Sequence, residues 1–153
     1  MAKAIDRRRI LAALGCVVVV ASVFRPGGAL AQRVSFAKRG TRLRKALLDS
    51  VRPTFERDTR GPVEFVVHRL AVSGRFAFGH VSSQRPGGGR IDWTKTVYAK
   101  ELREGFFDPG ASYFLLRKSN GGWRLVDYIV GPTDVPWEGW RQRFKLPTKL
   151  FLD

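Results

Sequence analysis

Residues 112–130 read SYFLLRKSNGGWRLVDYIV, and this stretch decides the fold class. It holds two runs rich in aromatic and branched apolar residues, 112–118 and 123–130, which favour extended strands. Between them lies Asn120-Gly121, a pair that tolerates positive φ and is typical of a type I′ turn. The stretch therefore predicts an antiparallel hairpin.

A second hairpin is predicted upstream, where residues 63–70 and 75–81 are again rich in Val and Phe on either side of turn residues. The length of its turn decides where the two histidines lie. A two-residue turn at Ser73-Gly74 puts His68 and His80 on opposite faces of the sheet, whereas a turn one residue longer puts them on the same face. The sequence leaves both lengths open.

A helix is predicted at residues 42–52, with Thr41 as its N-cap. Its apolar positions recur every four residues and make one stripe. These positions are Leu43, Leu47, Val51 and Phe55. Pro53 is expected to kink or restart the helix, because it has no N–H to donate and its ring clashes with the preceding turn. Residues 60–62, Arg-Gly-Pro, are expected to end it.

A short helix is predicted near the C-terminus, where Asp134 can cap it and Trp137, Trp140 and Phe144 lie on one face as a lid over the sheet. The whole order is helix, strand pair, irregular excursion, strand pair and short helix. This order predicts an α+β domain, in which an N-terminal helix packs on a four-stranded antiparallel sheet and a short C-terminal helix follows.

Four short motifs within residues 42–145 carry a resemblance to known proteins. They are GPVEFV at 61–66, IDW at 91–93, GWRLV at 122–126 and GPTDV at 131–135. In these motifs the chain is similar to an uncharacterised group of small exported bacterial proteins, and its element order resembles the cystatin-like folds and, within them, the NTF2-like domains. The resemblance implies a fold and an exported life but no mechanism, because NTF2-like domains include both enzymes and binding modules.

The first 31 residues are typical of a cleavable export signal. Basic residues precede an apolar run at 10–24, which is shorter than the ~20 residues of a membrane-spanning helix. The small residues Ala29 and Ala31 then form a signal-peptidase site. These features predict a mature chain that begins at Gln32 and a periplasmic or secreted location.

The export route stays open between the general secretory and the twin-arginine pathways. Residues 7–11, RRRIL, resemble the twin-arginine pattern, but three bases before an apolar run also suit the secretory route. The single Cys16 lies inside the signal, so the mature chain is expected to have no disulfide and no thiolate. No later segment is long and apolar enough to span a membrane.

Behind the signal the chain has room for one domain. The predicted boundaries are a flexible lead-in at residues 32–40, a single α+β domain at 41–146 and a C-terminal tail at 147–153. About 120 residues suffice to bury one core without disulfides or metals. No cofactor is expected.

Charge indicates the kind of partner. The chain has 28 Lys and Arg residues against 13 Asp and Glu, a formal net charge of +15. Such a surface attracts anionic partners, although a basic composition alone explains the charge equally well. The expected partner is an anionic envelope component or another exported protein and not nucleic acid, because export removes that partner. The binding residues predicted on this basis are Arg42, Arg44, Lys45, Arg52, Arg141, Arg143 and Lys145.

The sequence contains no recognisable catalytic, metal or nucleotide motif. His68 and His80 are the only histidines, and their spacing matches no metal-site motif. Asp127 interrupts a mostly apolar strand and is expected to share a face with Leu125 and Phe114. Its carboxylate then either pairs with an arginine of the helix or, with His80, performs acid–base chemistry in a pocket.

The sequence thus predicts a non-enzymatic exported domain with a basic binding face. The alternative is an NTF2-like pocket domain that binds or transforms a small molecule, with His80 and Asp127 as its catalytic residues. A third possibility is an accessory domain that assembles with a larger exported enzyme.

Overall fold

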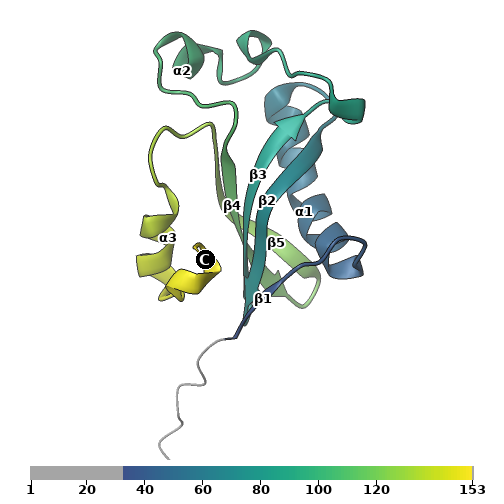
Figure 1. Cartoon of the computed structure of the whole chain (residues 1–153), viewed down its shortest axis with the longest axis vertical. Helices are drawn as coiled ribbons and strands as arrows, with labels where there is room; N and C mark the ends of the chain where they lie inside the picture. The colour runs from purple at the N-terminus through teal and green to yellow at the C-terminus, as the bar shows by residue number, and fades with distance from the viewer. Residues whose placement is uncertain (1–32, 153) are drawn as a thin grey trace, which may run out of the picture.

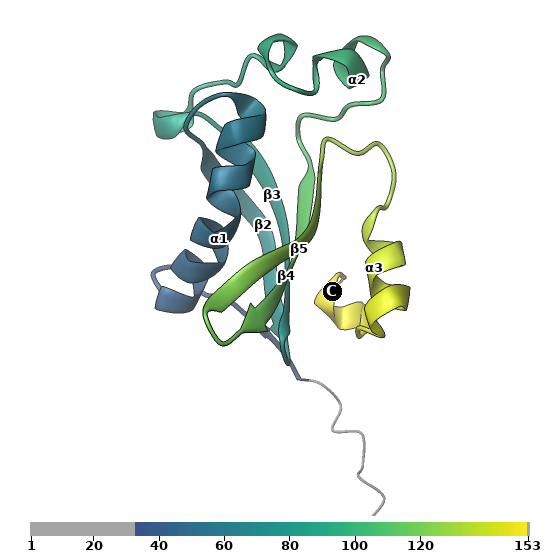
Figure 2. The ribbon, with the colours of Figure 1, turned by 180° about the vertical axis from the view of Figure 1, so that it is seen from behind.

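The computed structural model describes residues 33–152, whose strands form one antiparallel sheet with a helical layer on each face (Figures 1 and 2). The sheet has five strands in sequential order. They are β1 (Val34–Phe36), β2 (Glu64–Ser73), β3 (Phe76–Gln84), β4 (Ser112–Ser119) and β5 (Gly122–Val130). The predicted α+β class, with one main helix on an antiparallel sheet and a short C-terminal helix, is confirmed. The predicted export signal, with Ala29 and Ala31, lies outside the described residues.

The sheet has one strand more than the four predicted. The additional strand is β1, which pairs with the end of β2 through Val34 opposite Ser73 and lies in the segment predicted as a lead-in. The amide of Ala37 then donates to the carbonyl of Leu70 at 2.9 Å, and the chain leaves the sheet. Three residues offer too few positions for an alternating pattern, so this strand could not be predicted.

The main helix, α1 (Arg42–Thr59), covers one face of the sheet. Its predicted N-cap is confirmed, because the amide of Arg44 donates to Thr41 Oγ1 at 3.2 Å. The first helical segment was predicted to reach only about residue 52, but α1 is one helix that continues through Pro53. Its predicted end at residues 60–62 is confirmed, since α1 ends at Thr59 and Arg60 caps it with φ of 57°. The apolar stripe explains why the helix continues past Pro53, because Phe55, beyond the proline, is fully buried against the sheet.

Aromatic residues fill the space between α1 and the sheet. The ring of Phe55 packs edge-on against Phe65 and Phe114, with ring centres 5.2 and 6.5 Å apart. Phe114 in turn lies over Gly79, its partner on β3, where a Cβ atom would sit only 2.1 Å from the ring. Gly79 therefore provides the room that the Phe114 ring occupies.

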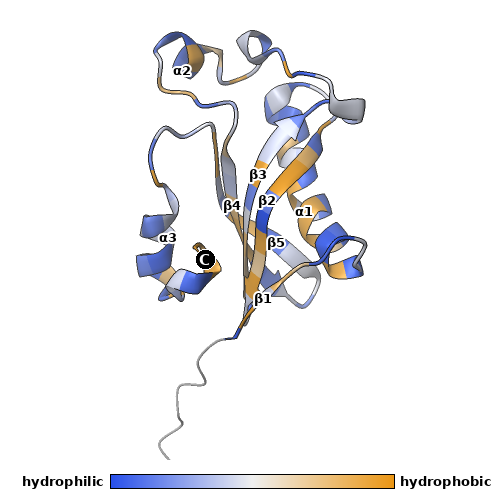
Figure 3. Ribbon diagram, viewed as in Figure 1, coloured by the Kyte–Doolittle hydropathy of each residue, from blue (hydrophilic) through white to orange (hydrophobic). Residues whose placement is uncertain are grey.

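The opposite face of the sheet is covered by α3 (Trp137–Phe144) and by the following turn η3 (Thr148–Leu150). Trp140 is only 7% exposed and belongs to a second apolar cluster, so the predicted lid is confirmed. Leu150 and Phe151 are also buried there. Figure 3 shows hydrophobic residues along β2 and mostly hydrophilic residues on α3.

The predicted cap of this helix is wrong. Asp134 lies before the helix, which begins at Trp137 directly after Pro136 and has no side-chain cap. A proline next to the first helical residue is pre-set for helical φ, so the helix can begin there without Asp134.

The β4–β5 hairpin is confirmed, but its predicted turn type is wrong. Ser119 pairs with Gly122, which leaves Asn120-Gly121 as the loop. Neither loop residue has positive φ; Gly122 does, at 112°. The glycine after the loop thus supplies the left-handed backbone, as in a turn followed by a glycine bulge.

Between β3 and β4 the chain makes an excursion over one end of the sheet (Figures 1 and 2). It contains the short helical turns η1 (Pro86–Gly88) and η2 (Trp93–Lys95) and the helix α2 (Ala99–Arg103). Trp93 and Tyr98 both pack on Phe107, with ring centres 4.9 and 5.4 Å from it. Phe107 belongs to the apolar core and the other two rings pack against that core, so the three rings hold the excursion in place.

The close contact of Gly79 with Phe114 predicts a large effect of one added methyl group. The substitution Gly79→Ala should lower the free energy of unfolding by about 2 kcal/mol, because the methyl group would displace a fully buried ring. Urea unfolding followed by tryptophan fluorescence measures the change.

Gly139→Ala is the matched control, because Gly139 lies in α3 and has nothing within 4 Å of its would-be Cβ. This change should stabilise the protein by about 0.5–1 kcal/mol, since alanine loses less backbone freedom in a helix. Equal destabilisation by both substitutions would contradict the packing argument.

Candidate functional site

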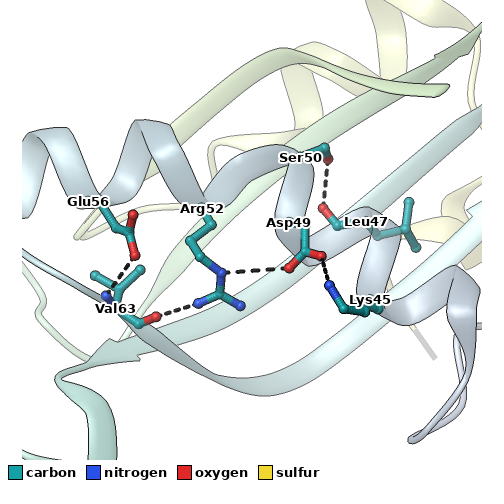
Figure 4. A network of polar contacts seen from close by, with 7 residues as sticks. All are labelled: Lys45, Leu47, Asp49, Ser50, Arg52, Glu56 and Val63. Atoms are coloured by element: carbon teal, nitrogen blue, oxygen red, sulfur yellow. Dashed lines mark hydrogen bonds and ion pairs between the residues drawn. The ribbon is translucent and has the colours of Figure 1, made fainter. Parts of the chain in front are cut away.

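The outer side of α1 carries a row of charged side chains (Figure 4). Lys45 donates a hydrogen bond to the carboxylate of Asp49, and Nε of Arg52 lies 3.7 Å from the other Asp49 oxygen. The hydrogen bond from Lys45 holds the pKa of Asp49 below its usual value. Arg52 also donates to the carbonyl of Val63, and its guanidinium lies 5.3 Å from the centre of the Phe65 ring. These contacts fix the row in position.

A shallow groove of about 550 Å³ follows this row. Its lining consists of Gly40, Thr41, Arg42, Arg44, Lys45, Leu48, Asp49 and Arg52. Four of these side chains are basic, and they are the four residues of α1 that the sequence predicted as binding residues. Asp49 is the one carboxylate in the lining. Arg44 donates from Nη1 to the carbonyl of Ala37 at 3.3 Å, which anchors it at the start of the helix. The groove therefore has an excess of positive charge.

The three predicted binding residues near the C-terminus lie elsewhere. Arg141 is on α3 and donates to the carboxylate of Glu138, with Nε 2.9 Å from Oε2. Arg143 is on the same helix, and Lys145 follows it in a left-handed conformation with φ of 51°. Because α1 and α3 cover opposite faces of the sheet, the seven predicted residues form two separate basic surfaces (Figures 1 and 2).

The turn between β2 and β3 matches neither of the two turns that the sequence left open. Ser73 pairs with Phe76, so the loop is Gly74-Arg75, and Gly74 has the positive φ of 56° that the first position of such a turn requires. In a regular ladder this register would put the two histidines on opposite faces. The pairing shifts, however, between Val67 and Arg69.

The shift is a β-bulge at His68, and it changes the face on which that residue lies. Val67 pairs with Val81 and Arg69 pairs with His80, so His68 is an extra residue on β2. The bulge brings the rings of His68 and His80 together, with centres 4.8 Å apart. The two histidines therefore share a face of the sheet because of the bulge rather than because of the turn.

His68 also contacts a serine, but the polarity of the contact argues against a nucleophile. Nε2 of His68 lies 2.6 Å from Oγ of Ser82. The Ser82 hydroxyl donates its hydrogen to the carbonyl of Gly110, so the imidazole must donate to the serine oxygen. An imidazole that donates to a serine cannot remove its proton, and the pair lacks the arrangement of a serine nucleophile and its base.

Asp127 does not lie where the sequence placed it. The β4–β5 pairing shifts at Val126, so that Leu115 pairs with Asp127 while Leu116 pairs with Leu125. Asp127 and Leu125 consequently lie on opposite faces. The partner of the carboxylate is not an arginine of α1; it is Trp140, whose indole Nε1 donates to Oδ2 at 2.8 Å.

The structure therefore does not bring His80 and Asp127 together. His80 lies on β3 and pairs with Tyr113, whereas Asp127 lies on β5. Strand β4 separates them, which puts their backbones about 10 Å apart. The indole of Trp140 already occupies one oxygen of the carboxylate, and no geometry for joint acid–base work results.

The most buried carboxylate of the described chain is Asp58, which the sequence did not single out. It is 6% exposed and lies at the end of α1. The hydroxyls of Tyr98 and Tyr128 both donate to its Oδ2, at 2.9 and 2.7 Å, and Nε of Arg57 donates to Oδ1 at 2.8 Å. The sequence does indicate that Asp58 faces the sheet, because Asp58 follows Phe55 by three positions and so falls on the apolar stripe of the helix.

The charge of Asp58 is maintained by these donors. Burial alone would raise the pKa of its carboxyl, but the hydrogen bonds from Tyr128, Arg57 and Tyr98 outweigh burial and lower the pKa below 3.8. Burial and the neighbouring carboxylate raise the pKa of both tyrosines. The cluster thus joins α1, the excursion and β5 through one ionised group.

A groove of about 380 Å³ lies beside the two tyrosines. Its lining includes the aromatic residues Tyr98, Phe106, Phe107 and Tyr128. Both tyrosine hydroxyls already donate to Asp58, so these rings offer the groove mainly apolar surface. The one charged side chain in the lining is that of Glu101, and a single carboxylate is not the set of converging polar groups that orients a substrate.

No protein-family model matches the chain, and no curated protein or solved structure matches it either. The fold defines the class of the protein as an α+β domain, with one main helix and a five-stranded antiparallel sheet. Among residues 33–152, no group of three or more His, Cys, Asp and Glu side chains is placed to hold a metal ion. No helix in this described part has the length and hydrophobicity of a membrane span.

The Asp58 cluster predicts how stability depends on pH. A carboxyl whose pKa is lower in the folded than in the unfolded state stabilises the fold above the unfolded value. This contribution should be complete above about pH 4 and should be lost as the pH falls through the lowered pKa of Asp58. Thermal unfolding measured from pH 7 to pH 2 tests the dependence.

The substitution Asp58→Asn should cost about 2 kcal/mol at pH 7, because two partly buried tyrosine hydroxyls lose their ionised acceptor. It should also flatten the loss of stability below pH 4. Asp134→Asn, at an exposed position, is the control and should leave both quantities unchanged. An acid dependence that persists in the Asp58→Asn protein would assign it to other carboxyls.

Proposed function

We propose that this chain is an exported, non-enzymatic binding domain that holds an anionic partner on the outer side of α1. The observation that carries the proposal is the groove along α1, where four basic side chains surround one carboxylate. The partner is an anionic envelope component or an acidic surface of another exported protein. The three basic residues near the C-terminus lie on the opposite face and are not part of this site.

The arrangement of the groove suits a partner with several negative charges. Arg42, Lys45 and Arg52 lie along one side of α1, with Lys45 one turn after Arg42 and Arg52 two turns after Lys45, so their charges form a line rather than a point. Asp49 contacts Lys45 and lies near Arg52, and it limits their mutual repulsion while no partner is bound. A line of cations at a surface attracts polyanions at long range and releases them as salt rises.

The fold itself supports a finer assignment as part of this proposal. A strand precedes the main helix, and four antiparallel strands follow it in sequential order. This order favours a cystatin-like arrangement, in which the sheet packs against the helix. In the present chain, three fully buried residues of α1, Leu47, Val51 and Phe55, fill that interface. Binding at the surface suits such a packed interior better than binding within it does.

Export predicts a specific N-terminus. The protein recovered from the periplasmic or secreted fraction of its host should begin at Gln32, because cleavage is expected after Ala31. Mass spectrometry of the intact protein gives the terminus directly. Replacing Ala31 by a bulky residue, as in Ala31→Phe, should leave an uncleaved precursor. A cytosolic protein that retains Met1 would refute the export part of the proposal.

The binding site can be tested with two variants of equal charge. The change Arg42→Gln with Lys45→Gln removes two positive charges from the α1 groove, and Arg143→Gln with Lys145→Gln removes two from the opposite face. Vesicles that contain phosphatidylglycerol provide an anionic surface, and polyglutamate mimics an acidic protein. Binding to each is measured by co-sedimentation or fluorescence across a salt series.

The α1 variant should bind about 30-fold more weakly, since each basic residue near an anionic surface contributes about 1 kcal/mol. The variant on the opposite face should keep nearly the affinity of the unchanged protein. If both variants lose affinity equally, overall charge drives binding and the groove is not a site. If neither variant changes, or neither probe binds at low salt, the proposed surface is wrong.

A further inference from the structure

A second hollow lies where the chain passes from β1 to α1, beside residues 67–70 of β2. It has a volume of about 380 Å³, which is a usual size for a small-ligand site. Its polar side chains are those of Arg44, His68, Arg69 and His80, and the rest of its described lining is apolar. The α1 groove shares only Arg44 with this hollow.

The charge of this lining selects an anion. Two guanidiniums and two imidazoles surround the hollow, and no carboxylate lies among the described residues that line it. Groups of one sign around a concave surface concentrate ions of the opposite sign there. A ligand with a negatively charged head therefore fits the hollow, and a cation does not.

The two arginines are held in different ways. Arg69 donates from Nε and Nη2 to three carbonyls of residues 149–152, at 2.6–3.0 Å, which ties its charge to the C-terminal turn. The side chain of Arg44 donates from Nη1 to the carbonyl of Ala37 at 3.3 Å. Its Nε and Nη2 atoms have no partner among residues 33–152, and this parallel pair of donors matches the two oxygens of a carboxylate.

His80 offers a further donor. It is partly buried, and its ring lies nearly parallel to that of Tyr113, with ring centres 4.5 Å apart. Burial and the adjacent His68 lower the pKa of His80, so this imidazole is neutral at pH 7 and carries one N–H. No described residue accepts a hydrogen bond from it. A carboxylate oxygen in the hollow supplies the missing acceptor.

Binding of an anion here is coupled to the uptake of protons. The rings of His68 and His80 have centres 4.8 Å apart, so a charge on one ring disfavours a charge on the other. A carboxylate beside the rings has the opposite effect and raises the pKa of an imidazole. Because a pKa that is higher in the bound state means that binding takes up protons, the affinity increases as the pH falls from 7.5 to 5.5.

The other titratable groups around the two rings keep a constant charge over this range. Arginine, lysine and carboxylate side chains do not ordinarily titrate between about pH 5.5 and pH 7.5. Burial and Asp108 raise the pKa of Tyr113, so this residue stays uncharged. These surrounding groups are Arg44 of α1, Arg69 of β2, Asp108 before β4, Tyr113 of β4 and Lys149 of the C-terminal turn.

The apolar part of the lining indicates the rest of the ligand. Phe36 is 55% exposed and Leu152 is 47% exposed, although both side chains are large and apolar. Both of them line the hollow. A short hydrocarbon chain attached to the carboxylate covers them, and the removal of this apolar surface from water strengthens binding.

We propose that this hollow is a binding site for a small amphiphilic carboxylate, such as a short-chain fatty acid. Arg44 binds the carboxylate through a pair of donors, and His80 donates to it. Arg69 adds positive charge, and Phe36 and Leu152 cover the hydrocarbon chain. The inference does not depend on the proposed α1 surface, because the ligand is a different one and only Arg44 is common to both sites.

The test is an NMR titration of the purified full chain without a histidine tag, in which His68 and His80 give the only imidazole signals. The probe is hexanoate, and 1-hexanol and acetate supply the chain and the charged head alone. Hexanoate should shift the His80 signal with one saturable site and raise the pKa of His80 by at least about 0.5. Its affinity should be at least about 2-fold higher at pH 5.5 than at pH 7.5. Hexanol and acetate should each bind at least about 10-fold more weakly.

Single substitutions test the residues. Arg44→Gln should weaken hexanoate binding by at least about 10-fold, because a charged pair of hydrogen bonds is lost. His80→Gln should reduce the gain in affinity at pH 5.5, with the His68 signal as the readout. Arg124→Gln removes one charge at an exposed position of β5 and should leave the affinity unchanged. Circular dichroism confirms that each variant is folded.

The proposal is overturned if hexanoate gives no saturable shift of the His80 signal, or if hexanol or acetate binds as tightly as hexanoate. It is also overturned if Arg44→Gln binds as tightly as the unchanged protein, or if Arg124→Gln weakens binding as much as Arg44→Gln does. If Arg44→Gln does not fold, His80→Gln decides, because an unchanged pH dependence in that variant contradicts the site.

Discussion

Strand β4 is buried on both faces, and the rest of the structure depends on this constraint. Phe114, Leu115 and Leu116 are adjacent in sequence and all three are fully buried. Because successive side chains of a strand point to opposite faces, both faces of β4 must be covered. Each such side chain contributes about 1.5–3 kcal/mol when it leaves water. One helix cannot cover two faces, so α1 packs on Phe114 and Leu116 while α3 and the C-terminal turn pack on Leu115.

The sequence predicted those parts of the fold that depend on local patterns. The stripe of α1, the β4–β5 hairpin and the aromatic lid on α3 follow from periodicity and turn residues, and all three are present. The strand β1 was missed because it is too short for a pattern. The bulges at His68 and Val126 were missed because an inserted residue changes the face of its neighbours without any change in composition.

In the candidate sites, too, the features set by local sequence could be predicted and those set by packing could not. The basic residues of α1 could be named from the sequence, because charge and helical spacing are local properties. Their separation from the basic residues of α3 could not, since it depends on which face of the sheet each helix covers. The Asp58 cluster could likewise not be predicted from the sequence, because its two tyrosines lie 40 and 70 positions further along the chain. Contacts over such distances follow from the finished packing.

The two bulges have another consequence, which concerns contacts between molecules. Part of β2 beyond β1 and the whole of β5 are sheet edges, and an unpaired edge can serve as a template for a strand of a second chain. Each of these two strands carries its extra residue within its length, at His68 and at Val126. The irregular spacing interrupts the row of N–H and C=O groups that an incoming strand would need. The same irregularities that place the histidines thus oppose edge-to-edge association and protect the folded domain from aggregation.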